Sequence, residues 1–207
     1  MSRIPCFRRP SRVLALVLLA LSVTATHAQP AADAGLRGAF AAAARGQTVP
    51  AHMSGHPAYG WVEFTALRRN LVTLPASQAD AFMQRYRGQA VAEVFREGWL
   101  RALANRGEWQ GVRAAWSPSI TNTALRCIEL DARAKTGALD AQWTRDVQAI
   151  WRSSGASLPD TCDAPLQTLA QRGELGDALR WERFELAAAE VGVVVETGTT
   201  TQQDAEQ

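Results

Sequence analysis

The stretch QAVAEVFREGWLRALAN, residues 89–105, shows in one segment how this chain is built. Its apolar residues recur every three or four positions, which places them on one side of an α-helix and the charged residues on the other. The apolar side is predicted to hold Val91, Val94, Phe95, Trp99, Ala102 and Leu103. Glu97 precedes Arg101 by four positions, the spacing at which the two side chains pair across one helical turn.

Segments of this kind recur along the chain and end at glycines. A glycine just past a helix adopts the left-handed backbone that closes the last turn. Such stops are predicted at Gly46, Gly107, Gly137, Gly155 and Gly173. Helices are predicted over 33–45, 57–71, 77–86, 91–105, 108–115, 122–135, 140–153, 163–172 and 174–190. Side-chain caps at the helix starts are predicted for Ser77, Asn122, Asp140 and Asp163.

The alternation of apolar and polar residues that marks a strand is nearly absent, so no sheet is predicted. Short amphipathic helices joined by tight turns favour an all-α fold, in which antiparallel helix pairs stack side by side into a superhelix like that of an α-solenoid. The glycine stops are irregularly spaced, and a compact helical bundle therefore remains the alternative.

The first 28 residues have the composition of a secretory signal peptide. Four arginines, the last of them Arg12, precede an apolar run from Val13 to Val23, and Ala28 ends a stretch of small residues suited to cleavage. The run is about half the ~20 residues that span a bilayer, so we expect a cleaved leader and export to the periplasm; an uncleaved N-terminal anchor is the alternative. The expected organisation is a signal peptide over 1–28, a helical domain over 29–190 and a divergent, disordered tail over 191–207.

Removing the leader changes the charge balance. The whole chain has 22 basic and 20 acidic residues, and the leader takes four arginines and no acid, which leaves 18 basic residues. Lys135 is the only lysine. A nucleic-acid surface needs clustered Lys and Arg, so no nucleic-acid partner is expected.

The chain has three cysteines, and Cys6 lies in the predicted leader. In an oxidising compartment the other two, Cys127 and Cys162, are expected to form a disulfide. A closed loop of 35 residues stabilises a fold by up to about 4 kcal/mol in the chain-entropy model. The alternative, a catalytic thiol, needs an unpaired cysteine and an activating base.

Residues with chemical potential are scattered. His52 and His56 have the i, i+4 spacing of a metal pair, but Pro57 breaks the helix that such a pair needs, so no metal site is predicted. The carboxylates are interpreted as solvated helix faces: Glu93, Glu97, Glu108, Glu129, Asp131, Glu174, Asp177, Glu182 and Glu185. No cofactor-binding motif or known nucleophile motif occurs, and no catalytic, cofactor or metal residue is predicted.

Tryptophan is abundant for this length, with residues at positions 61, 99, 109, 116, 143, 151 and 181. Most of them share helical spacing with other apolar residues, which favours packing in the core. An exposed subset that stacks on sugar rings is compatible with the same pattern.

An ordered series of segments resembles the N-terminal superhelical region of soluble lytic murein transglycosylases. The matching segments are 55–57 with Tyr59, Trp61, Glu63 and Leu67; 82–86 with Gly88; 97–103 with 106–109; 125–130 with Ala132 and Arg133; Trp151; 157–163; and 175–186. The most specific part is a helix cysteine followed later by Leu158-Pro159-Asp160-Thr161-Cys162-Asp163.

The resemblance implies a right-handed superhelix of helix pairs in a periplasmic protein whose partner is the glycan strand of peptidoglycan. Family members cleave the MurNAc-GlcNAc bond to form 1,6-anhydro-MurNAc, with a glutamate of a C-terminal lysozyme-like domain as acid and then base. This chain ends before any such segment, so it is expected to be a scaffold that is inactive by itself. A periplasmic helical-repeat module that binds a protein partner is the alternative.

Overall fold

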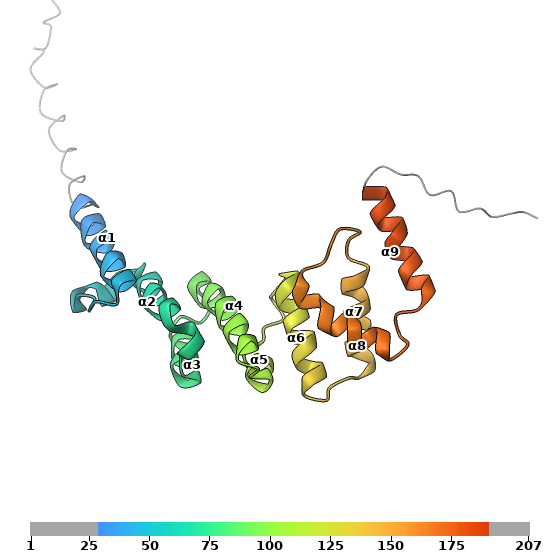
Figure 1. Cartoon of the computed structure of the whole chain (residues 1–207). Coiled ribbons are helices and arrows are strands. Elements are labelled where there is room, and N and C mark those ends of the chain that lie inside the picture. The colour runs from blue at the N-terminus through green and yellow to red at the C-terminus, as the bar shows by residue number, and fades with distance from the viewer. Residues whose placement is uncertain (1–28, 191–207) are drawn as a thin grey trace, which may run out of the picture. The chain divides into compact units, whose positions relative to one another are not determined.

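The computed structural model describes residues 29–190, so the predicted signal peptide and the tail from Val191 lie outside the described residues. The described part contains nine α-helices, three 3-10 helices and no strand (Figure 1). The elements are α1 (Gln29–Arg45), η1 (Ala51–Gly55), α2 (Tyr59–Leu67), η2 (Arg68–Thr73), α3 (Ala76–Arg85), α4 (Ala90–Asn105), α5 (Trp109–Ala115), α6 (Thr123–Lys135), α7 (Ala141–Trp151), η3 (Asp160–Cys162), α8 (Asp163–Gln171) and α9 (Asp177–Glu190). The prediction of an all-α fold is confirmed. Within 29–190, none of these helices combines the length and the hydropathy that a membrane crossing requires.

The chain divides into two compact units, one ending at Val62 and the other beginning at Glu63. In the first unit, α1 contacts η1, and Ala39, Ala43 and Met53 are buried. The Met53 sulfur lies 3.7 Å from the place where a Cβ on Gly35 would stand.

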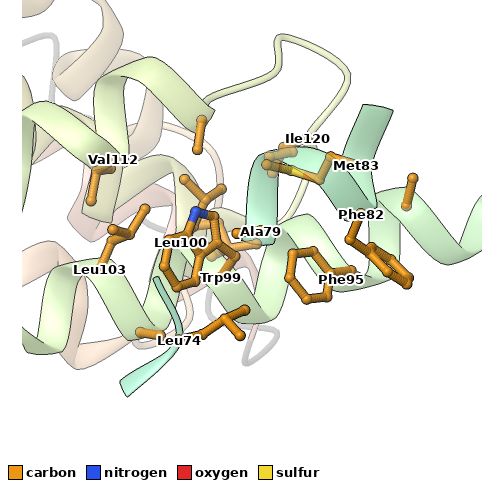
Figure 2. Packing of buried hydrophobic residues seen from close by; sticks show 14 of the residues in the cluster. Leu74, Ala79, Phe82, Met83, Phe95, Trp99, Leu100, Leu103, Val112 and Ile120 are labelled. Atoms are coloured by element: carbon orange, nitrogen blue, oxygen red, sulfur yellow. The ribbon is translucent and has the colours of Figure 1, made fainter. Parts of the chain in front are cut away.

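The second unit contains two cores, and α3, α4, α5 and α6 share the first, part of whose packing is shown in Figure 2. Phe82 of α3 and Phe95 of α4 meet with ring centroids 4.5 Å apart, and Trp99 lies one turn further along α4 with 2% of its surface exposed. Burying one large apolar side chain contributes roughly 1.5–3 kcal/mol. Val94 is an exception to the predicted apolar face: it is 44% exposed, and Ala92 and Leu100 are buried on α4 instead.

A second core connects α6, α7 and α8. It consists of Cys127, Leu130, Trp143, Val147, Ile150, Cys162 and Leu169. Trp143 is fully buried, and its indole Nε1 donates to the carbonyl oxygen of Leu130 at 2.8 Å. The polar end of this large side chain therefore has a partner inside the core.

Two of the four predicted caps are present. The Asn122 side chain accepts from the amide of Leu125 at 3.1 Å, and that of Asp140 accepts from the amide of Trp143 at 2.8 Å. The other two predictions were wrong. Ser77 lies inside α3, which begins after Pro75, and Asp163 directly continues the 3-10 turn that ends at Cys162.

Four of the five predicted glycine stops have the left-handed backbone: Gly46, Gly107, Gly137 and Gly173, with φ between 70° and 81°. Gly155 lacks it and is required for a different reason, a close approach to α9. The single helix predicted over 57–71 is divided: α2 ends at Leu67, and Asn70 leaves helical geometry within η2.

Candidate functional site

The two cysteines of the second core form the predicted disulfide. Their sulfur atoms are 2.02 Å apart and their Cα atoms 4.8 Å apart. Cys127 lies within α6 and Cys162 ends η3, so the bond fastens the loop before α8 to the middle of α6. Thr161 reinforces this junction by donating from its hydroxyl to the carbonyl of Ala124 at 3.1 Å.

Of the two histidines with the spacing of a metal pair, His56 makes a side-chain hydrogen bond to the backbone. Nδ1 of His56 accepts a hydrogen bond from the amide of Ala58 at 3.1 Å, just before α2. His52 lies in the 3-10 helix η1. Among residues 29–190 there is no cluster of three or more His, Cys, Asp or Glu side chains that could hold a metal ion.

Most of the scattered carboxylates form ion pairs with arginines of the helices or of the turns that join them. The pairs are Glu93–Arg96 at 3.4 Å, Glu97–Arg101 at 3.7 Å, Glu108–Arg106 at 2.8 Å, Glu174–Arg172 at 2.9 Å, Asp177–Arg180 at 3.2 Å and Glu182–Arg152 at 2.6 Å. Glu97 and Arg101 thus pair as the sequence predicts. Exposed pairs of this kind contribute at most about 1 kcal/mol each.

Glu129 and Asp131 on α6 differ from these carboxylates in the effect of burial on their pKa values. Burial raises the pKa of both carboxyl groups above their ordinary values. Arg133 opposes the shift for Glu129 from 4.0 Å, but this arginine also binds Asp140 at 3.1 Å and Asp146 at 2.7 Å. Glu129 therefore shares one cation with two competing carboxylates.

Glu63, one of the residues in the resemblance, lies in a small polar cluster. Its carboxylate accepts from the hydroxyl of Tyr86 at 2.8 Å and pairs with Arg85. Burial and the neighbouring carboxylate raise the pKa of Tyr86 to about 12. The cluster ties the first residue of the second unit to the end of α3.

The tryptophans separate into buried and exposed groups. Trp99 and Trp143 are core residues, and Trp109 and Trp116 pack against the first core. Trp151 is partly buried and donates from Nε1 to the carbonyl of Leu179 at 2.8 Å. Trp61 and Trp181 are 37% and 51% exposed.

On α9, Trp181 and Phe184 form an exposed aromatic pair. Their ring centroids are 5.2 Å apart with 31° between the planes, and Phe184 is 53% exposed. The indole Nε1 of Trp181 donates to the carboxylate of Glu185 at 2.8 Å. This hydrogen bond restrains the indole, and the two rings together present an apolar surface to solvent.

Sequence reasoning missed two arginines that bind backbone carbonyls. Arg106 donates to the carbonyls of Leu71, Val72 and Leu74 at 2.9–3.3 Å, and its guanidinium lies 4.7 Å from the ring centroid of Trp99. Arg183 donates to the carbonyls of Trp151, Ser154 and Ala156 at 2.6–2.9 Å. Each arginine joins a helix to an irregular segment about 30 residues away, and no local spacing signals such contacts.

The fold and these surfaces define a disulfide-fastened scaffold of short helices with an exposed aromatic pair. No family model matches the chain. Over 144 residues, 69% of its length, the chain is 24% identical to the soluble lytic murein transglycosylase of Salmonella typhimurium, and equally to that of Escherichia coli. It spans about a fifth, 22%, of the length of these relatives. Over this stretch the chain is homologous to soluble lytic murein transglycosylases, which confirms the resemblance.

Solved structures match as well. The lytic transglycosylase Slt of Pseudomonas aeruginosa, an inactive mutant, matches 76% of this chain with a TM-score of 0.68 and 21% identity, over 26% of its own length. The 70-kDa soluble lytic transglycosylase of Escherichia coli matches 68% of the chain with a TM-score of 0.61 and 22% identity, over 23% of its length. A complex of the 70-kDa soluble lytic transglycosylase with bulgecin A matches 77% of the chain with a TM-score of 0.66 and 20% identity, over 27% of its length. At this identity the matches show the fold, which is that of a helical part of these enzymes.

Proposed function

We propose that residues 29–190 are the superhelical scaffold region of a soluble lytic murein transglycosylase. In this role the region is exported to the periplasm and holds the glycan strands of peptidoglycan. The observation that carries the proposal is the homologous stretch, which covers 69% of the chain and only 22% of relatives that are named for their action on murein.

The aromatic pair of α9 supplies a contact for a sugar ring. The face of an indole or phenyl ring is apolar and flat, and it packs against the apolar face of a sugar while the hydroxyl groups remain in water. Trp181 and Phe184 are each about half exposed, and Glu185 fixes the indole. We assign glycan contact to these two residues.

The carboxylates of the described helices support a role in holding substrate rather than in cleaving it. Cleavage of a glycosidic bond needs an acid with a raised pKa placed against the bond. Glu129 and Asp131 have raised pKa values, but Glu129 lies against Arg133, and Asp131 is partly offset by Lys135. We therefore expect the 207-residue chain to bind murein without cleaving it.

A sedimentation assay with purified murein sacculi tests the proposal, together with a turbidity assay on the same sample. Co-sedimentation without loss of turbidity is expected. Loss of turbidity would contradict the assignment of a purely holding role.

The second candidate is a periplasmic module that binds a protein partner. The exposed surface of α9 favours it as well, because exposed aromatic residues are typical of protein interfaces. The same assay separates the two, since a protein-binding module does not co-sediment with purified murein.

A further inference from the structure

A hollow of about 300 Å³ lies among α3, α4 and α5, remote in sequence from the aromatic pair of α9. Its charged side chains come from two segments: Asp80 on α3 with Arg87 in the turn after it, and Glu93 with Arg96 on α4. Its apolar lining consists of Met83 and three alanines: Met83, Ala92 and Ala115 are buried, and Ala114 is exposed at the edge. The three alanines leave the space that the charged residues surround.

The charges of the hollow balance and are partly held in place. Arg96 donates from Nη1 to the carbonyl of Ala115 at 2.8 Å, which fixes its guanidinium against the end of α5. Its Nε lies 3.4 Å from the Glu93 carboxylate but is buried and makes no hydrogen bond. Arg87 donates to the side chain of Gln84. Two guanidinium groups and two carboxylates thus line one small concave site.

A ligand must match this lining. A neutral sugar offers only hydroxyl groups to these four charged side chains and forms no ion pair with any of them. A short zwitterionic peptide offers a carboxylate to the arginines and an amine to Asp80 and Glu93 in charge-assisted hydrogen bonds. The volume is at the lower end of the range of ligand pockets, which suits a short segment rather than a folded partner.

The geometry points to a second binding site in this hollow, for the short peptides that murein carries on its glycan strands. This inference rests on the proposed function, because it names the part of the same polymer that the scaffold contacts away from the sugar. The arginines bind peptide carboxylates, and Asp80 and Glu93 bind a free amine.

The test uses the free tetrapeptide that an amidase releases from murein, titrated into the full chain by calorimetry. Saturable binding to the wild type is expected. Arg87→Glu reverses one charge of the site, and Ala114→Phe fills the space from its exposed edge; each is expected to weaken binding at least tenfold. Arg101→Glu on α4 lies outside the hollow and is the matched control, expected to bind like the wild type. Circular dichroism shows that each variant is folded.

Absence of saturable binding to the wild type would overturn the inference, and so would equal binding by Arg87→Glu, Ala114→Phe and Arg101→Glu. Sedimentation with murein glycan stripped of its peptides tests the proposed glycan-holding role independently of the peptide site. Glycan retained without any peptide binding would overturn the peptide site alone. Peptide bound without any glycan retention would overturn the glycan-holding role and leave the peptide site.

Discussion

Gly155 lies so close to Ala187 of α9 that a Cβ on the glycine would stand 2.3 Å from the Ala187 amide nitrogen. The backbone of the loop after α7 therefore packs directly on α9. The same junction holds the amide of Gly155, which donates to the Glu190 carboxylate at 2.9 Å. These contacts hold α9 against the loop, and α9 carries the rings of Trp181 and Phe184. They therefore support the surface that we propose for glycan contact.

Replacing Gly155 with alanine should displace α9 from the loop. The clashing atoms belong to the backbone and cannot rotate away, so we expect a loss of about 1–3 kcal/mol in the free energy of unfolding, measured by urea denaturation. Gly176→Ala is the control, because nothing lies within 4 Å of a Cβ there. Equal stability of the two variants would mean that α9 does not pack on Gly155 in solution.

Reducing the Cys127–Cys162 disulfide should destabilise the second unit by up to about 4 kcal/mol, because the bond closes a loop of 35 residues in the unfolded chain. Urea denaturation with and without reductant measures the loss. The Cys127→Ala, Cys162→Ala double variant should be less stable than the oxidised wild type and insensitive to reductant. An unchanged midpoint for the wild type in reductant would contradict the expected contribution.

Arg106 satisfies three carbonyl groups of the segment that leads into α3. Arg106→Ala removes these bonds and the packing on Trp99, and we expect a loss of about 2–3 kcal/mol in unfolding free energy. Arg106→Lys keeps the charge but not the planar fork, so it should recover only part of the loss. Glu108→Gln removes the exposed ion-pair partner alone and should cost less than about 1 kcal/mol. Full recovery by lysine would contradict a requirement for the planar guanidinium at this position.

Glu129 should make the stability fall as pH rises. Burial raises the pKa of its carboxyl group in the folded chain above the ordinary value of 4.5, so folding favours the protonated form. The resulting stabilisation is complete below the unfolded pKa and is lost as pH rises through the folded pKa. Glu129→Gln has no such proton to lose. Unfolding free energies measured from pH 4 to pH 7 should therefore decline less in the variant than in the wild type. Parallel pH dependences of the two proteins would contradict a raised pKa for Glu129.

Local pattern predicted most helix positions because buried faces repeat every turn, as Phe95, Trp99 and Leu103 do on α4. It failed where contacts between distant segments decide the backbone. A helix was predicted through Leu71, but Arg106 holds the carbonyls of Leu71 and Val72, and the segment is η2.

The helix predicted to begin at Glu174 begins at Asp177, because the amide of Glu174 closes the end of α8 on the carbonyl of Leu169. The candidate surfaces were predictable only in part. The number of tryptophans suggested an exposed subset, but the pairing of Trp181 with Phe184 and the charged hollow depend on how neighbouring residues and helices pack.

The most direct test of the glycan-holding role is sedimentation of the full chain with peptide-stripped murein glycan, comparing the wild type with the Trp181→Ala, Phe184→Ala double variant. Truncating an aromatic contact residue at an interface costs more than about 1 kcal/mol, so the double variant should bind at least about fivefold more weakly. Trp181→Tyr keeps an aromatic ring and should retain most of the binding, while Val72→Ala, at a 61% exposed apolar residue away from α9, should bind like the wild type. Equal retention of the double variant and the wild type, or no retention of either, would contradict the account.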